Sequence, residues 1–147
     1  MTSRLYPKTP LIGACTAIWR GDKVLLAKRS RPPLGDKWAM PGGLVEVGES
    51  LAEAAIRETY EETSLHIKAP IFNRFHELIR KDAENRIEMH YVLAMFAAQC
   101  DEGSARAGDD AEDVGWFSLH ELQSLTLTPN TLELVTEGRD LLYKRAS

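Results

Sequence analysis

The feature that most constrains this chain is a run of acidic residues that leads into a helix. The stretch from residue 43 to 65, GLVEVGESLAEAAIRETYEETSL, holds six carboxylates in 23 residues. Ser50 is suited to cap a helix, and Glu53 can complete a capping box with it. The sequence therefore predicts a helix over residues 51–63.

Three of these carboxylates share one face of the predicted helix. With 3.6 residues per turn, Glu58, Glu61 and Glu62 occupy positions i, i+3 and i+4. Adjacent like charges repel and destabilise a helix unless a cation lies between them. Hard divalent ions prefer oxygen ligands, so the pattern predicts a site for Mg²⁺ or Mn²⁺.

The same stretch resembles the signature of the Nudix hydrolases, in which glycine, glutamate and an Arg-Glu…Glu-Glu block follow at fixed spacing. An ordinary solvated acidic helix would explain the charge but not the Pro41-Gly42-Gly43 turn that leads into it. The two departures from the signature are Thr59, where an aliphatic residue is usual, and Ser64, where glycine is usual. Seven of the nine defined positions match: Gly43, Glu49, Arg57, Glu58, Glu61, Glu62 and Leu65.

Each departure predicts a local structural consequence. Ser64 stands where the helix should end in a left-handed residue, which costs a non-glycine residue roughly 1 kcal/mol. We therefore expect either a strained Ser64 or a different helix exit. Thr59 lies on the adjoining, mostly apolar face, where its hydroxyl can donate to a helix carbonyl.

The resemblance implies roles for the residues that match the signature. Glu58, Glu61 and Glu62 are expected as metal ligands, with Glu58 or Glu62 doubling as the general base, and the carbonyl of Gly43 is implied as a further ligand. Arg57 lies about 100° around the helix from Glu58, so it is expected to pair with Glu49 across the turn, in support of the site. In the family the base is sometimes an acid from a loop.

Residues outside the signature supply the remaining candidates for the metal and the phosphates. The acidic loop at 101–113 can provide an extra ligand or base, for which we favour Glu112 and then Asp110. The remaining acids of that loop are expected only to keep it solvated. Arg29 matches a position where MutT-like members contact substrate phosphates, although it can equally be a solvated cation beside its basic neighbours.

Two further residues are candidates for contacting the substrate. Trp38, just before the Pro-Gly-Gly turn, is the aromatic residue best placed in the sequence to line the site. Asn130 follows Pro129 as in the segment with which MutT-like enzymes contact a purine. Asn130 or the next threonine can instead cap a helix.

The order of the predicted elements indicates an α/β (α+β) sandwich with one sheet. The resemblance implies the Nudix fold, a mixed β-sheet between helices, and a single domain over residues 1–147. A capping box predicts a short helix after Ser118. Besides the helix over 51–63, we expect strands at 11–19, 23–28, 38–40, 67–79, 88–98 and 114–117, a loop at 30–37, and a final helix at 132–143.

Bulk properties exclude several classes of function. The net charge of −4 argues against a surface for nucleic acid polymers, which needs clustered lysine and arginine. The sequence lacks a long apolar run for a membrane span and an apolar core for a secretory signal. Cys15 and Cys100 have no metal-like spacing and are expected as free thiols. We therefore expect a cytoplasmic protein with a small-molecule nucleotide substrate, and the resemblance allows a homodimer.

The resemblance implies an enzyme that cleaves the diphosphate linkage of a nucleoside diphosphate joined to another group, such as ADP-ribose, a dinucleotide or a sugar nucleotide. The main alternative is pyrophosphohydrolysis of a nucleoside triphosphate for nucleotide sanitation. A domain that only senses a nucleotide is a third reading. It is disfavoured because such domains usually lose the carboxylates, and all three are present here.

Overall fold

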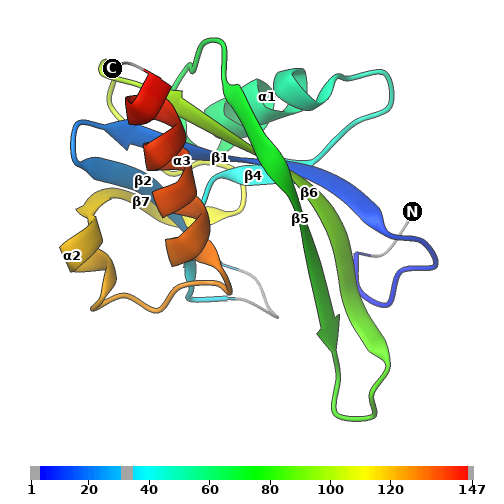
Figure 1. Ribbon diagram of the computed structural model, residues 1–147. Coiled ribbons are helices and arrows are strands. Elements are labelled where there is room, and N and C mark those ends of the chain that lie inside the picture. The colour runs from blue at the N-terminus through cyan, green and yellow to red at the C-terminus, as the bar shows by residue number, and fades with distance from the viewer. Residues whose placement is uncertain (1–3, 31–34, 146–147) are drawn as a thin grey trace.

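The computed structural model describes residues 4–30 and 35–145, in which a mixed β-sheet lies between helices (Figure 1). The helix α1 covers one face of the sheet and α3 covers the other. The strands are β1 (Leu11–Arg20), β2 (Lys23–Arg29), β3 (Trp38–Ala39), β4 (Gly42–Leu44), β5 (Ile71–Lys81), β6 (Ile87–Gln99) and β7 (Ala111–Ser118). The helices are α1 (Leu51–Thr63), α2 (Leu119–Leu122) and α3 (Thr131–Arg145).

Strand β1 is the centre of the sheet. It pairs in parallel with β6 along most of its length and in antiparallel fashion with β2 and β4 on its other edge. The β2 pairing covers only residues 18–20 of β1, and the β4 pairing covers residues 13–15. Since β2 parts from β1 after its first residues, β4 occupies the edge that β2 leaves. Strand β2 pairs in turn with β3 and β7.

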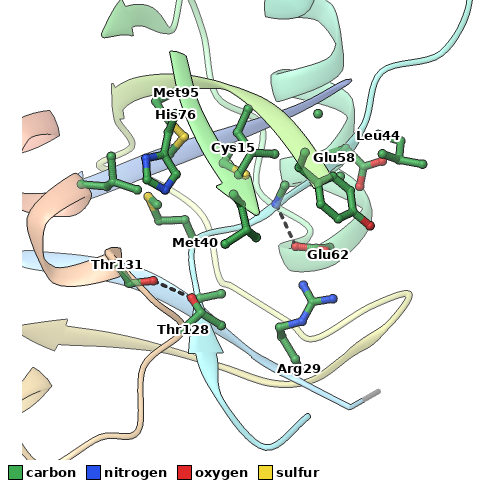
Figure 2. A pocket seen from close by; sticks show the side chains of 18 of the residues that line it. Cys15, Arg29, Met40, Leu44, Glu58, Glu62, His76, Met95, Thr128 and Thr131 are labelled. Carbon is green, nitrogen blue, oxygen red and sulfur yellow. Dashed lines mark hydrogen bonds between the residues drawn. The ribbon is translucent and has the colours of Figure 1, made fainter. Parts of the chain in front are cut away.

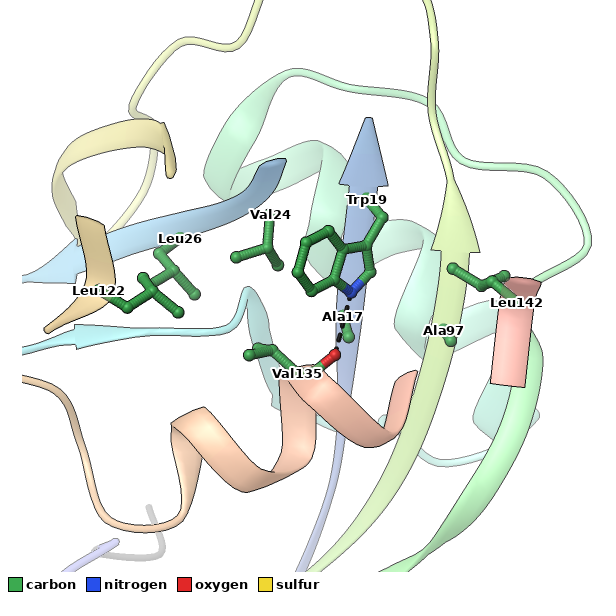
Figure 3. Close-up of a cluster of buried hydrophobic side chains, with 8 residues drawn as sticks. All are labelled: Ala17, Trp19, Val24, Leu26, Ala97, Leu122, Val135 and Leu142. Atoms are coloured by element: carbon green, nitrogen blue, oxygen red, sulfur yellow. Dashed lines mark hydrogen bonds between the residues drawn. The ribbon is translucent and has the colours of Figure 1, made fainter. Parts of the chain in front are cut away.

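Alternation along β1 distributes its side chains between the two helices. Ala17 and Trp19 join a buried cluster with residues of α3, whereas Ala14 and Ile18 belong to clusters on the α1 side. The indole Nε1 of Trp19 donates to the backbone carbonyl of Val135 at 3.0 Å, which fixes α3 on the sheet (Figure 3). The two helices are thereby held on opposite faces.

Strands β5 and β6 form a long hairpin that extends away from the helices (Figure 1). Asp82 closes its turn: its backbone N–H donates to the carbonyl of Arg86 at 2.9 Å, and its carboxylate accepts from the N–H groups of Glu84 and Arg86. Among the described helices, none has the length and apolar character that a membrane span requires.

The helix prediction for residues 51–63 is confirmed in detail. Ser50 and Glu53 form the capping box at the start of α1. At its end Ser64 is left-handed, with φ 65° and ψ 12°, as the strained alternative predicted. Thr59 is buried, as its place on the apolar face predicted, but the expected bond from its hydroxyl to a helix carbonyl is absent, since the hydroxyl has no partner among the described residues. The back-bond of this type is made one turn later, where the Thr63 hydroxyl donates to the Thr59 carbonyl.

The structure corrects two other expectations about local structure. Residues 42–44 form β4 rather than a turn, because their extended backbone pairs with the free edge of β1. The strand expected from residue 67 begins only at Ile71, since Ala69 has a left-handed backbone (φ 44°) and Pro70 follows it. The remaining helices and strands lie where expected to within a few residues, and the capping box of Ser118 and Glu121 starts α2. Of the loop expected at 30–37, residues 31–34 lie outside the described residues.

Candidate active site

A pocket of about 170 Å³ lies against the sheet where β1 and β4 meet α1, β5, β6 and the start of α3. Figure 2 shows its two ends: Arg29, Glu58 and Glu62 lie at one, and His76, Met40 and Met95 lie at the other. We call these the carboxylate end and the apolar end. The volume can hold on the order of ten water molecules, so a small organic ligand can enter.

Helix α1 brings its C-terminal carboxylates against the backbone of β4. The Glu58 side chain is only 12% exposed, and one oxygen of Glu62 accepts the Gly42 N–H at 3.1 Å. A Cβ atom built at Gly43 would lie 2.4 Å from the carboxyl carbon of Glu58, so glycine is required for this approach. The Pro-Gly-Gly segment therefore fixes the positions of the Glu58 and Glu62 carboxylates by close backbone contact.

Arg57 and Glu49 form the ion pair that the sequence predicted. The Arg57 Nε and one terminal nitrogen donate to the two oxygens of Glu49 at 2.7 and 2.9 Å. The other terminal nitrogen donates to Glu58 at 2.8 Å and to Glu61 at 3.1 Å. Arg57 therefore contacts the carboxylates of the site directly. The contact with Glu61 is the i,i+4 pair that helix periodicity allows, whereas the contact with Glu58 was not indicated by the sequence.

The acidic loop is tied to the C-terminal end of α1 by backbone hydrogen bonds. The N–H groups of Arg106 and Gly108 donate to the carbonyls of Thr63 and Glu62 at 2.8 and 2.9 Å, which satisfies orphan acceptors of the helix. A Cβ atom at Gly108 would lie 2.5 Å from the carbonyl oxygen of Glu61, so this contact also requires glycine. The next residue, Asp109, is thereby delivered to the site.

Three carboxylates in this region fit a divalent cation. One oxygen each from Glu58, Glu61 and Asp109 lie within 4.8 Å of one another. Carboxylate oxygens are the donors that Mg²⁺ and Mn²⁺ prefer, and a small inward movement of such side chains gives octahedral ligand distances. Glu62 lies beside the group but is not part of it.

The pKa values of two carboxyl groups are raised at this end of the pocket. Burial raises the pKa of Glu62 to about 8, and the neighbouring carboxylates of Glu58 and Asp109 add to this, against the Gly42 N–H and Arg29. Burial also raises the pKa of Glu58, although Arg57 opposes the shift. A cation would favour the ionised form of both groups.

The structure brings Asp109 to the site, not Glu112. Glu112 belongs to β7, which begins at residue 111 rather than 114. Its carboxylate lies 3.9 Å from the amine of Lys28 on β2. Asp110, the second choice from the sequence, lines the pocket. The sequence identified the acidic loop, but the preference within it failed because strand pairing of residues 111–118 turns Glu112 toward β2. In the sequence, the glycine at position 108 was the feature that could have indicated a close backbone contact immediately before Asp109.

The three proposed substrate contacts have different positions. Arg29 lines the carboxylate end (Figure 2). Trp38 is not among the described residues that line the pocket; its ring packs edge-on against Phe117 at 5.0 Å between centroids. Asn130 also lies outside the lining, with a left-handed backbone (φ 66°) and its amide 3.4 Å from Glu133, although Pro129 lines the pocket.

The apolar end of the pocket was not predicted from the sequence. Its signal was the alternation along β6, which turns every second side chain to the pocket face. The residues of β6 that line the pocket are Met89, Tyr91, Leu93 and Met95, and those of β5 are His76 and Leu78.

Comparison with known proteins gives consistent matches. A family model described as the NUDIX domain matches residues 9–137. The chain is 34% identical over 122 residues to the ADP-ribose pyrophosphatase of Methanocaldococcus jannaschii, covering 83% of this chain and 69% of that protein.

Two further matches differ in how much of the other chain they cover. The chain is 34% identical over 126 residues to the NAD-capped RNA hydrolase NudC of Yersinia enterocolitica, covering 83% of this chain but only 43% of that protein. Among solved structures, the MutT NUDIX hydrolase from Burkholderia pseudomallei superposes with a TM-score of 0.76 at 30% identity, covering 88% of this chain and 98% of the other.

Proposed function

Because this chain belongs to the Nudix hydrolase family, we propose that it hydrolyses the diphosphate linkage of a nucleoside diphosphate joined to another group, such as ADP-ribose, a dinucleotide or a sugar nucleotide. The observation that carries the proposal is the two-ended pocket, in which clustered carboxylates adjoin an apolar end. Such a pocket suits a molecule with a diphosphate at one end and an aromatic group at the other.

Hydrolysis of a diphosphate brings water to a phosphorus that is already surrounded by negative oxygens. A bound divalent cation supplies neutralisation of the phosphate charge and a lowered pKa of water. We propose that Glu58, Glu61 and Asp109 hold this ion, with Mg²⁺ as the physiological choice and Mn²⁺ as a substitute. The Gly43 carbonyl, beside the Glu58 carboxylate, is proposed as a further ligand.

Glu62 and Arg29 are the candidates for the two remaining roles. One role is to accept the proton of the attacking water, and the other is to bind the phosphates of the substrate. Glu62 lies outside the group of three, and one of its oxygens is held by the Gly42 N–H at 3.1 Å. Its other oxygen is proposed to take the proton of the attacking water. Arg29 lines the carboxylate end of the pocket. It is proposed to donate hydrogen bonds to the phosphate oxygens, replacing the water molecules that the substrate loses when it binds.

Pyrophosphohydrolysis of a nucleoside triphosphate is the second candidate. It is kept because the same carboxylates would serve either reaction and because the chain matches a MutT NUDIX hydrolase at 30% identity. The two reactions differ in products. Triphosphate cleavage releases inorganic pyrophosphate, whereas cleavage of ADP-ribose releases a nucleoside monophosphate and a sugar phosphate.

The test is turnover of a nucleotide panel in Mg²⁺, with products resolved by chromatography. We expect cleavage of ADP-ribose, a dinucleotide such as NAD or a sugar nucleotide to a nucleoside monophosphate, and loss of turnover by orders of magnitude in Glu61→Gln and Glu62→Gln with folding intact. Glu77→Gln, an exposed position on β5, is the control for charge removal and should retain activity. Absence of any phosphoanhydride cleavage by the wild-type protein would refute an enzymatic function.

We also propose a cytoplasmic location, because both cysteines, Cys15 and Cys100, are free thiols, as is usual in a reducing compartment. A thiol-labelling assay on protein from intact cells would test this. Because both thiols are shielded in the folded protein, labelling is done after denaturation. Labelling of both cysteines without prior reduction is expected, whereas blocked thiols would contradict it.

A further inference from the structure

A buried nitrogen at the apolar end of the pocket has no partner. His76 lies on β5 and lines the pocket, and its Nε2 is buried without a hydrogen-bond partner among the described residues. Buried polar atoms in folded proteins are nearly always hydrogen-bonded, so an unpaired one calls for an explanation. A bound ligand with a matching donor or acceptor would supply the partner once neighbouring side chains move to uncover the nitrogen.

The strand register gives the position of His76 relative to the carboxylates. A row of paired residues runs from His76 on β5 across β6 and β1 to Leu44 on β4. Three strand spacings of about 4.8 Å separate the two ends, or about 14 Å in all. Since Glu58 approaches β4 at the residue before Leu44, only an extended ligand can reach both His76 and the carboxylates.

The surroundings of His76 restrict the chemistry of that ligand. Leu78 and Tyr91 face each other across β5 and β6 on the pocket side, and Leu93 lies directly opposite His76. Met40 and Met95 lie at the same end of the pocket as His76 (Figure 2). Methionine side chains are flexible and adapt to an occupant. A sugar would lose the hydration of several hydroxyl groups here, whereas a flat heteroaromatic ring would need only one or two hydrogen bonds.

We propose that His76 determines base specificity by forming a hydrogen bond through Nε2 to the nucleobase of the substrate. The nucleobase then occupies the apolar end and the second group of the substrate lies outside it. Imidazole nitrogen can donate or accept according to its tautomer, so it can match either polar edge of a base. This inference rests on the proposed function, because it requires a nucleoside diphosphate whose diphosphate lies at the carboxylates.

The test compares His76→Leu with His90→Leu. His90 lies on β6 at a position between pocket-lining residues, so its side chain is on the other face of the sheet. One series of substrates varies the base with the sugar constant: ADP-glucose, GDP-glucose and UDP-glucose. A second series varies the sugar with the base constant: ADP-ribose, ADP-glucose and ADP-mannose.

We expect His76→Leu to change the ratios of kcat/KM between bases by about tenfold, the effect of one lost hydrogen bond, and to leave the ratios between sugars within about twofold. His90→Leu should leave both sets of ratios unchanged. The urea midpoint of His76→Leu should equal or exceed that of wild type, because an unpaired buried nitrogen is removed. Unchanged base ratios, or changed sugar ratios, would overturn the inference.

A binding measurement separates this inference from the proposed hydrolysis. Calorimetric titration with AMP, GMP, UMP and ribose 5-phosphate needs no turnover. If the wild-type protein binds a mononucleotide and cleaves nothing, the proposed function fails, and the effect of His76→Leu on the ratios of Kd between bases still decides the role of His76. If it binds no mononucleotide, the role of His76 is rejected.

Discussion

Arg57 and Glu49 are joined by two parallel hydrogen bonds, of 2.7 and 2.9 Å, between the guanidinium and both carboxylate oxygens. The same guanidinium donates to Glu58 and Glu61, and also to the carbonyl of Leu44 at 2.9 Å. One side chain thus ties β4 and the loop after it to the helix that carries the carboxylates. Its planar, fixed array of donors is what allows these contacts at once.

Replacement of Arg57 by lysine is expected to reduce kcat/KM by about 10- to 100-fold, because the ammonium group cannot hold Glu49 in bidentate fashion while orienting Glu58. The free energy of unfolding should fall by no more than about 1 kcal/mol, since the ion pairs are partly exposed. Steady-state kinetics and urea unfolding measure the two quantities. Arg86→Lys, at an exposed ion pair in the hairpin turn, is the matched control; equal kinetics for both variants would contradict the role of Arg57.

Glu49 should make the stability of the protein depend on pH in the acid range. The side-chain hydrogen bond from Arg57, helped by the Glu46 N–H, lowers the pKa of Glu49 from 4.5 to about 2. A lowered carboxyl pKa stabilises the folded state fully above the unfolded pKa and ceases to do so as pH falls through the folded value. The contribution is therefore present above pH 4.5 and lost toward pH 2.

Urea midpoints of the wild type and Glu49→Gln, measured from pH 7 to pH 3, test this linkage. We expect the wild type to be the more stable by a constant margin at neutral pH and by a shrinking margin below about pH 5. Glu77→Gln controls for the loss of a carboxylate from an exposed position. If the difference in urea midpoint between the two proteins stays constant down to pH 3, the contribution of Glu49 to stability does not depend on its protonation.

Much of the site could be predicted because its main parts are local in sequence. Glu58, Glu61 and Glu62 share a helix face by periodicity alone, and the limits of that helix follow from Ser50 and Glu53 through the capping box. The pairing of Arg57 with Glu49 was also within reach, since only the cap and nearly two turns of α1 separate them in sequence. Short-range geometry of this kind depends little on the rest of the fold.

The parts that escaped prediction depend on contacts between distant segments. Asp109 reaches Glu58 because backbone bonds tie its loop to the end of α1, and among the acidic residues of the run only the preceding Gly108 distinguishes it from Glu112. Residues 42–44 form a strand because β2 leaves an edge of β1 open. His76 faces the pocket through its register with Leu93, which no local pattern fixes.

Replacement of Gly43 by alanine tests how the carboxylates are seated. The new Cβ atom would lie 2.4 to 2.6 Å from the carboxyl atoms of Glu58 and must displace that group. We expect kcat to fall about 100-fold, as for a misplacement of about 1 Å at a reacting centre. Gly115→Ala is the control, because its Cβ atom would crowd the Phe117 ring at 2.8 Å instead. The control should lose stability but keep its turnover, and a fully active Gly43→Ala would refute the close approach.

Replacement of Ser64 by glycine should raise stability without affecting catalysis. Ser64 ends α1 in the left-handed region, with its N–H donating to the Tyr60 carbonyl at 2.8 Å, so the cap requires this conformation. Glycine adopts it without the steric cost, and we expect the free energy of unfolding to rise by up to about 1 kcal/mol, reduced by the greater entropy of glycine in the unfolded chain. Ser64→Ala removes the hydroxyl but keeps the Cβ atom, so it should show no gain. Urea unfolding of the two variants separates relief of backbone strain from loss of the side-chain oxygen, and an equal change in both would rule out strain as the cause.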